Sequence, residues 1–267
     1  MDNRPIGVFD SGLGGLTVVR ALSKLLPDEN IVYFGDTGRV PYGTRSETTI
    51  KQYAKQDAEF LLSHDVKMII AACGTVSSVA PKTGDSLPVP FLGVVAPAAK
   101  EAVKATKTKK IGILGTSATI KSGAYEREIK ALDPNLQTTS TDCPLFVPLV
   151  ESGWISPDDE ITTLTVKRYL KDVKNAGVDT LILGCTHYPL LIPFIRKEMG
   201  EGVTLISAGD AAAKQAEILL REGGLCGGEG KTEFFVSDTP SGFSKIASLF
   251  LQKEIGDKVT QVDITRS

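Results

Sequence analysis

The sequence contains few of the residues that build metal centres and redox motifs. Its 267 residues include two histidines and four cysteines, and no two cysteines are spaced as a CxxC pair. These counts exclude a histidine-rich metal site and argue against a zinc-binding or thioredoxin-like motif. We therefore expect no bound metal. A chain of this size and ordinary composition also does not need disulfides for stability, so we expect free thiols.

The sequence also lacks an excess of positive charge, a signal segment and a long apolar run. Its 30 basic and 32 acidic residues give a formal net charge of −2, which provides no electrostatic attraction to nucleic acid or to an anionic membrane. The N-terminal residues contain no apolar signal region, and no apolar run is long enough to span a bilayer. We expect a soluble cytoplasmic protein without nucleic-acid or membrane partners.

Short apolar runs alternate with helical patterns along the chain. This alternation is typical of an α/β protein in which helices cover both faces of parallel sheets. The predicted strands cover residues 6–9, 31–34, 68–72, 90–95, 110–114, 137–141, 180–183, 203–206, 232–237 and 258–264. The predicted helices cover residues 16–26, 46–62, 97–106, 125–131, 161–176, 189–199, 210–221 and 241–251, with another from residue 75. We interpret residues 144–151 as a loop or short turn, and Asp210 as the N-cap of its helix.

An internal repeat divides the chain into two similar halves. The segment Ile6-Gly7-Val8-Phe9-Asp10-Ser11 resembles Ile111-Gly112-Ile113-Leu114-Gly115-Thr116. Cys73 lies 67 positions after Ile6, and Cys185 lies 74 positions after Ile111. We predict two flavodoxin-like lobes related by pseudo-two-fold symmetry, with a cleft between them that receives one cysteine from each lobe. Residues 1–95 together with 208–267 would form the first lobe, and residues 96–207 the second.

Cys73 and Cys185 are the strongest candidates for chemistry. Each ends a short apolar strand, and the carboxyl ends of strands are where ligands bind in open α/β sheets. A helix that starts at such a position would lower the pKa of the thiol. Two thiols that face each other across a substrate carbon could exchange its proton, one as thiolate and the other as thiol. A cysteine is more commonly a small buried hydrophobic residue, and this interpretation is kept for Cys143 and Cys226.

A glycine-rich stretch follows the first predicted strand. Asp10-Ser11-Gly12-Leu13-Gly14-Gly15 opens a helix, and Asp36 follows the next strand, as in a dinucleotide-binding unit. However, Thr17 stands where the third glycine of that motif belongs, and Asp10 would place a carboxylate beside the pyrophosphate. We therefore favour a small anion, such as a substrate carboxylate, at this helix start. Asp10 would then face the substrate ammonium or act on a thiol.

His187 follows Cys185 by two residues. An imidazole at this distance could polarise the thiol or transfer a proton near neutral pH. The alternative is a histidine that only satisfies a backbone carbonyl. His64, the other histidine, precedes Asp65 at the end of a predicted helix, and we expect it at the surface.

Motifs spread over nearly the whole chain resemble those of the glutamate racemases, within the cofactor-independent aspartate/glutamate racemase family. The motifs are Asp10-Ser11-Gly12-Leu13-Gly14-Gly15, Asp36-Thr37, Pro41-Tyr42-Gly43, Ala72-Cys73-Gly74-Thr75, Gly115-Thr116, Thr119, Val150-Glu151-Ser152-Gly153 and Gly184-Cys185-Thr186-His187-Tyr188-Pro189-Leu190. Together they are specific, although none would be specific alone. The resemblance implies an isomerase that interconverts L- and D-glutamate without pyridoxal phosphate, a nucleotide, a metal or any other cofactor.

The resemblance also implies a role for each motif residue. Cys185 would remove the proton from L-glutamate and Cys73 from D-glutamate, on opposite faces of Cα. Asp10 would assist near Cys73, and His187 with Glu151 near Cys185. The substrate-binding residues would be Asp10, Ser11, Tyr42, Gly43, Gly74, Thr75, Thr119, Thr186 and His187. Many family members have Asn where this chain has Gly74, so binding there would rely on backbone amides, water or Thr75.

The resemblance further implies a homodimer in the bacterial cytoplasm that supplies D-glutamate for peptidoglycan, and so for cell wall biogenesis and cell shape. Three alternatives stay open. The chain could racemise aspartate or another acidic amino acid, because a difference of one methylene depends on pocket depth. It could be a small-carboxylate binding protein without chemistry, although binding needs no thiols. It could also be a Rossmann-like oxidoreductase.

Overall fold

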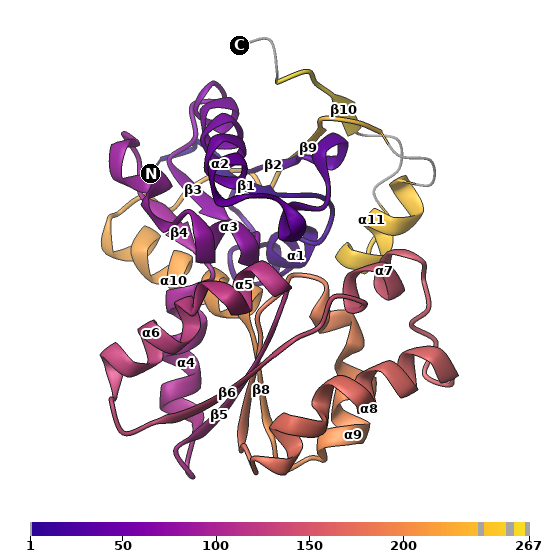
Figure 1. Cartoon of the computed structure of the whole chain (residues 1–267). Coiled ribbons are helices and arrows are strands. Elements are labelled where there is room, and N and C mark those ends of the chain that lie inside the picture. Colours follow the sequence, from indigo (N-terminus) through magenta and orange to yellow (C-terminus); the bar gives the residue numbers. More distant parts are fainter. Residues whose placement is uncertain (1, 240–242, 255–258, 265–267) are drawn as a thin grey trace.

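The computed structural model describes residues 2–239, 243–254 and 259–264. Two parallel sheets with helices packed on them form an upper and a lower half in Figure 1. The larger sheet contains β1 (Ile6–Asp10), β2 (Ile31–Gly35), β3 (Met68–Ala71), β4 (Phe91–Gly93), β9 (Thr232–Val236) and β10 (Val259–Gln261). The smaller sheet contains β5 (Lys110–Gly115), β6 (Gln137–Asp142), β7 (Thr180–Leu183) and β8 (Thr204–Ser207).

The two sheets repeat one topology, as the internal repeat predicts. The strand order is β10-β9-β2-β1-β3-β4 in the larger sheet and β6-β5-β7-β8 in the smaller one. The order β2-β1-β3-β4 therefore corresponds to β6-β5-β7-β8, and all of these pairs are parallel. The cysteine strands β3 and β7 each lie beside the first strand of their repeat. The predicted fold class is confirmed, while the lobe boundaries along the sequence stay a prediction.

Burial explains why the sequence locates the central strands well. β1, β3 and β7 are buried along their whole length. A central strand of a parallel sheet is covered on both faces, so apolar residues follow one another without alternation. The helices α1 (Leu16–Leu25) and α4 (Val95–Ala105) both pack against α10 (Ala208–Glu222). Since α1 belongs to the upper half of Figure 1 and α4 to the lower half, α10 joins the two halves.

Other helices cover the remaining sheet surfaces and the ends of the strands. They are α2 (Glu47–Leu62), α3 (Gly74–Val79), α5 (Ser117–Ser122), α6 (Ala124–Leu132), α7 (Phe146–Glu151), α8 (Glu160–Asn175), α9 (Ile192–Met199) and α11 (Phe243–Leu251). Short 3-10 helices are η1 (Thr37–Arg39), η2 (Tyr42–Thr44), η3 (Pro81–Ser86) and η4 (Tyr188–Leu191). Within the described part of the chain, none of the helices combines the length and apolar character that crossing a membrane requires.

Two local predictions are wrong. Residues 144–151 are not simply a loop, because Phe146–Glu151 forms the helix α7. Pro148 lies in the first turn of α7, where backbone N–H groups have no partner inside the helix. Because proline only lacks such an N–H group, it costs this helix no hydrogen bond. Asp210 is not the N-cap of α10, because its N–H is donated to the side chain of Ser207. β8 continues directly into α10, so the last residue of the strand becomes the cap.

Smaller differences concern the ends of elements. The strand predicted at residues 90–95 is limited to Phe91–Gly93, because Val94 is already the N-cap of α4 and donates its N–H to Ser77. The helix predicted at residues 189–199 starts with η4 before α9. Of the helix and strand predicted last, residues 241–242 and 258 lie outside the described residues, and the described parts form α11 and β10.

The glycine-rich segment 223–230 is anchored by a buried ion pair. The ammonium of Lys67 lies 2.5 Å from the carboxylate of Glu29 and donates to the carbonyls of Leu225 and Gly227. Glu29 in turn accepts the N–H of Gly227. The segment therefore has a fixed point against the first sheet although it forms neither helix nor strand.

Candidate active site

A cavity of about 350 Å³ lies where the carboxyl ends of the two sheets meet. It receives residues from both halves of the chain, at the position where ligands bind in open α/β sheets. The predicted site residues that line it are Asp10, Ser11, Tyr42, Gly43, Cys73, Gly74, Thr75, Glu151, Cys185, Thr186 and His187. Thr119 is the predicted site residue that lies outside this lining. The two strand-end cysteines thus share one cavity, as the repeat predicts.

Cys73 occupies a buried position at the start of α3. It is the N-cap of this helix, and its sulfur lies 3.5 Å from the hydroxyl of Ser11. Sequence reasoning predicts that the helix start lowers the pKa of the thiol. The amide of Val76 acts in that direction, but burial dominates and, together with the nearby Asp10, raises the pKa of Cys73 to about 12. Cys73 is therefore a thiol at neutral pH.

Asp10 places a carboxyl group beside Cys73. It ends β1 and is almost completely buried. One oxygen, Oδ2, accepts the N–H of Gly12 at 3.1 Å, whereas Oδ1 has no hydrogen-bond partner among the described residues. Burial raises the pKa of Asp10 above its ordinary value, although His187 acts in the opposite direction. A buried oxygen without a partner is costly, so Oδ1 is available to accept a hydrogen bond or a proton.

Cys185 lies beside a buried imidazole. Its sulfur is 3.8 Å from Nδ1 of His187, and Nε2 of His187 is 3.0 Å from Oε1 of Glu151. Burial alone would lower the pKa of His187, but the hydrogen bonds to Cys185 and Glu151 outweigh burial and raise this pKa to about 10. His187 is therefore a cation at neutral pH. A cation at this distance stabilises negative charge on the sulfur.

α11 also contacts His187. The ring of Phe250 meets the His187 ring edge to face, with ring centres 5.1 Å apart. Phe250 is completely buried. Sequence reasoning missed this residue, because 63 positions separate it from His187 and no motif connects the two.

The glycine-rich stretch after β1 packs against the segment that carries Cys185. A Cβ at Gly14 would lie 2.2 Å from Oγ1 of Thr186 and 2.4 Å from Nδ1 of His187. Thr17 donates its hydroxyl hydrogen toward the carbonyls of Gly14 and Thr186. The glycine at position 14 is therefore required because the second half of the molecule approaches it closely.

Gly74 allows the two cysteine segments to touch through their backbones. A Cβ at Gly74 would lie only 2.2 Å from the carbonyl oxygen of Gly184, far inside van der Waals contact. Gly74 follows Cys73, and Gly184 precedes Cys185. A side chain at position 74, such as the Asn that the resemblance leads us to expect, would therefore require the two segments to move apart.

Tyr42 lines the cavity with its ring, but its hydroxyl is used elsewhere. The hydroxyl contacts the carboxyl groups of Asp36 and Asp57, the latter at 3.0 Å. Arg39 pairs with both of these buried carboxyl groups, at 2.6 and 3.1 Å. The Tyr42 hydroxyl therefore fixes the η1–η2 loop against α2, and substrate binding by Tyr42 stays a prediction.

Thr116 lines the cavity in place of Thr119. Its Oγ1 lies 3.0 Å from Oγ1 of Thr75 and 3.0 Å from Oγ1 of Thr119, so the three hydroxyls form a chain that leads out of the cavity. The internal repeat carries a signal for this residue, because it pairs Thr116 with Ser11.

The residues that the structure describes give no separate indication of a metal site. Among the described residues, no group of three or more His, Cys, Asp or Glu side chains is suitably placed.

Comparison with known proteins assigns the family. The model of the Asp/Glu/hydantoin racemase family matches residues 6–216. The chain belongs to this racemase family. A glutamate racemase of Neisseria meningitidis is 48% identical over 255 residues, which cover 93% of this chain and 93% of the relative.

Solved structures of racemases agree with the family assignment. A glutamate racemase isoform from Bacillus anthracis superimposes with a TM-score of 0.93 at 38% identity, covering 98% of both chains. A glutamate racemase from Francisella tularensis, solved with D-glutamate, gives a TM-score of 0.92 at 38% identity and covers 100% of both chains. The predicted resemblance and the assignment to the isomerases are confirmed.

Proposed function

We propose that this racemase interconverts L- and D-glutamate by proton transfer between Cys73 and Cys185. The observation that carries the proposal is the position of the two thiols, which end corresponding strands of the repeat and line one cavity. The similarity to glutamate racemases along nearly the whole chain supports glutamate as the substrate. Two bases on opposite sides of one carbon suit a racemase, because removal and return of the proton must occur on opposite faces.

The charges around the two thiols suggest the starting state. For the conversion of L-glutamate the mechanism requires Cys185 as thiolate, which the His187 imidazolium 3.8 Å away favours, and Cys73 as thiol. The Cys185 thiolate removes the Cα proton of L-glutamate and becomes a thiol. The Cys73 thiol then gives its proton to the opposite face of Cα, which yields D-glutamate and a Cys73 thiolate. The reverse sequence converts D-glutamate, and proton exchange with solvent restores the first state.

Neutral donors bind the two substrate carboxylates in this proposal. The cavity lining offers the hydroxyls of Ser11, Thr75, Thr116 and Thr186 and contains no Lys or Arg among the residues that the structure describes. Asp10 is available for the substrate ammonium. The His187 imidazolium in this lining is already paired with Cys185 and Glu151. Because no Lys or Arg of the described lining holds a carboxylate at one point, both enantiomers can place Cα between the thiols.

The cellular role and assembly form a further part of the proposal. We place the enzyme in the bacterial cytoplasm, where D-glutamate enters peptidoglycan synthesis, and we expect a homodimer.

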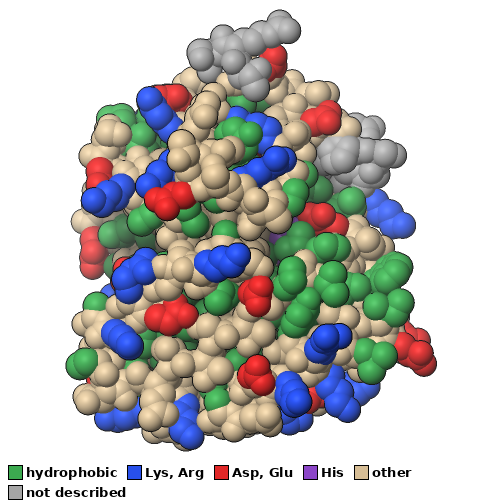
Figure 2. All heavy atoms as spheres, in the orientation of Figure 1, with side chains coloured by type: hydrophobic (Ala, Val, Ile, Leu, Met, Phe, Trp, Pro, Cys, Tyr) green, Lys and Arg blue, Asp and Glu red, His purple; other side chains and the backbone are tan. Residues whose placement is uncertain are grey.

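A candidate surface for the dimer lies on the second half. Figure 2 shows hydrophobic side chains gathered over the region of α7 and α8, and the exposed residues there include Leu145, Trp154, Ile161 and Leu164. An exposed apolar surface of this kind is typical of an interaction site. Sedimentation of the wild type and of Leu164→Glu tests whether a second copy covers it.

The enzymatic proposal is tested by racemisation assays in deuterated water. Circular dichroism should show that L- and D-glutamate each reach the racemic mixture, and mass spectrometry should find deuterium at Cα of the product. Aspartate serves as the control substrate, and its faster conversion would instead support an aspartate racemase. Glutamate binding without any solvent exchange would support a carboxylate-binding protein and would contradict the proposed chemistry.

A further inference from the structure

One segment of the first half, which we call the wall segment, forms a side of the catalytic cavity. It lines the cavity along five consecutive residues, Val40, Pro41, Tyr42, Gly43 and Thr44. No other run among the described lining residues is as long. A Cβ at Gly43 would lie 3.3 Å from Cβ of Thr116, so the wall segment reaches the second half of the molecule. The shape of the cavity therefore depends on the groups that hold this segment in place.

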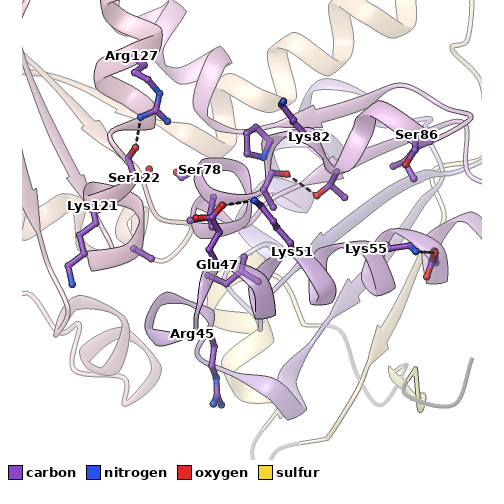
Figure 3. A pocket seen from close by; sticks show the side chains of 18 of the residues that line it. Arg45, Glu47, Lys51, Lys55, Ser78, Lys82, Ser86, Lys121, Ser122 and Arg127 are labelled. Atoms are coloured by element: carbon purple, nitrogen blue, oxygen red, sulfur yellow. Dashed lines mark hydrogen bonds and ion pairs between the residues drawn. The ribbon is translucent and has the colours of Figure 1, made fainter.

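The helix α2 brings a buried carboxyl group to the wall segment. Its exposed face carries charged side chains such as Glu47 and Lys51, which Figure 3 shows beside a groove outside the catalytic cavity. Its buried face contains the apolar residues Ile50 and Ala54 but also Asp57, whose side chain is completely buried. Burying a carboxyl group is costly unless it forms hydrogen bonds, so Asp57 depends on its partners.

Arg39 links the start of the wall segment to α2. Its guanidinium lies over the ring of Tyr53, 4.0 Å from the ring centre, and Nη1 is 2.6 Å from Oε1 of Gln56. Nη2 donates to Oδ1 of Asp57 at 3.1 Å, and Nε donates to Oδ2 of Asp36 at 2.6 Å. Because Arg39 directly precedes the wall segment, these contacts fix one end of it.

Two carboxyl groups meet the hydroxyl of Tyr42. The hydroxyl contacts Oδ2 of Asp36 and lies 3.0 Å from Oδ2 of Asp57. A phenol has one hydrogen, so it donates to one of these oxygens and not to both. Two carboxylates would leave one carboxylate oxygen facing the phenol oxygen without a hydrogen between them. The arrangement therefore requires a proton on one of the two carboxyl groups.

The remaining contacts decide which carboxyl group carries this proton. Asp36 accepts from Nε of Arg39 and also, through Oδ1, from the hydroxyl of Ser237 at 2.7 Å. Both of its oxygens therefore act as acceptors, as in a carboxylate. Oδ2 of Asp57 has the Tyr42 hydroxyl as its one partner among the described residues, so this oxygen has room for a hydrogen. Burial, followed by the charge of Asp36, raises the pKa of Asp57 well above its ordinary value.

We propose that Asp57 is a positioning residue for the racemase, a neutral carboxylic acid that donates to Tyr42 and accepts from Arg39. Tyr42 in turn donates to the Asp36 carboxylate, so every contact of the phenol contains a hydrogen. This chain of hydrogen bonds holds the wall segment against α2 before the substrate arrives. The substrate then does not have to order the wall segment, which lowers KM. The inference rests on the proposed racemisation of glutamate, because it assigns a role in that reaction to a residue outside the cavity lining.

Steady-state kinetics with L-glutamate tests the proposal at position 57. Asp57→Asn presents an amide NH₂ to Tyr42 and an amide oxygen to Arg39, so KM should stay within about twofold of the wild type. Asp57→Ala loses both contacts, and KM should rise about tenfold or more. In both variants kcat should change by less than about threefold, because the two thiols keep their surroundings. Asp172→Ala, at an exposed position of α8, is the control and should match the wild type.

The comparison of asparagine with alanine separates a neutral Asp57 from an ion pair. If Asp57 were a carboxylate paired with Arg39, asparagine would remove the charge and both variants would lose affinity. Equal increases in KM for Asp57→Asn and Asp57→Ala would therefore overturn the proposal, as would a wild-type KM in Asp57→Ala. A loss confined to kcat would contradict a role through the wall segment. Thermal unfolding shows whether each variant is folded.

Infrared difference spectra detect the proton without any turnover. At neutral pH, the spectrum of the wild type minus that of Asp57→Asn should contain the carbonyl stretch of one protonated carboxyl group. The wild type minus Asp172→Ala should lack this band, and the contribution of Asp10 cancels because all three proteins contain it. Absence of the band at position 57 would overturn the proposal even where Asp57→Ala does not fold. A wild type that shows the band without racemising glutamate would refute the proposed function but support the neutral Asp57.

Discussion

The two cysteine segments have equivalent positions in the fold and different chemical surroundings. Cys73 follows β3 and Cys185 follows β7, at corresponding places in the two sheets. Cys73 has a hydroxyl and a carboxyl group with a raised pKa as its neighbours, whereas Cys185 has an imidazolium supported by Glu151. The repeated topology places both thiols in the lining of one cavity, and the neighbouring side chains give them different electrostatic surroundings. In this account the enzyme at rest holds one base and one acid.

The largest expected effect comes from removing the partner of Cys185. His187→Asn should lower kcat/KM for glutamate by about 100-fold or more, because the thiolate loses its cation and acid–base contributions are of this size. The loss must be equal for L- and D-glutamate, since enantiomers have the same free energy. His64→Asn, at the other histidine, is the control and should leave the rate unchanged. A His187→Asn rate near that of the wild type would remove the proposed difference between the two thiols.

A second substitution separates the two segments sterically. Gly74→Ala introduces a Cβ 2.2 Å from the carbonyl oxygen of Gly184. Overpacking of this kind typically costs about 1–3 kcal/mol, and we expect both the melting temperature and kcat/KM to fall. Gly202→Ala is the matched control, because a Cβ there meets nothing within 4 Å. Equal melting temperatures of the two variants would show that the backbone contact does not restrict the site.

Two variants test whether Thr116, which the repeat pairs with Ser11, contributes more to the reaction than Thr119. Thr116→Val removes a hydroxyl from the cavity, and kcat/KM should fall about threefold to tenfold, as for the loss of one hydrogen bond. Thr119→Val removes a hydroxyl that lies outside the lining, and its effect should be smaller. Steady-state kinetics of both variants with L-glutamate decides the order. The opposite order would restore Thr119 as the contact residue.

The smallest expected effect is on stability as a function of pH. The pKa of folded His187 is raised to about 10, so its stabilisation is complete below the ordinary histidine pKa of about 6.5 and is lost as pH rises through the folded value. Cys185, Glu151 and Asp10 are the titratable groups around it. The difference in melting temperature between the wild type and His187→Asn should therefore be largest near pH 6 and should shrink as pH rises from about 6.5 to about 10. A difference that does not change with pH would contradict a charged His187.

Sequence reasoning was most successful where one local pattern decides the structure. Continuous apolar runs located β1, β3 and β7, because these strands are buried on both faces. The sequence of residues 144–151 instead predicts a loop or short turn, whereas Phe146–Glu151 forms α7. Prolines usually interrupt helices. Pro148 escapes that rule only because it stands in the first turn, and this position depends on where the helix begins.

The candidate site was predictable as a set of residues but not as a set of contacts. The motifs and the repeat bring almost all of the expected residues into one cavity. The contact between Gly74 and Gly184 joins positions 110 residues apart, and the hydroxyl of Tyr42 is taken by Asp57 of α2. Such contacts depend on how the two halves pack, so only the three-dimensional structure reveals them.

The most direct test of the central claim is solvent exchange at Cα in single-cysteine variants. In deuterated water, Cys73→Ser retains the Cys185 base and should place deuterium in L-glutamate, which stays L, while D-glutamate keeps its proton. Cys185→Ser should show the reverse pattern, and neither variant should racemise at an appreciable rate. Exchange into both enantiomers by either variant would mean that one group reaches both faces of Cα, and would contradict a mechanism with two differently charged thiols.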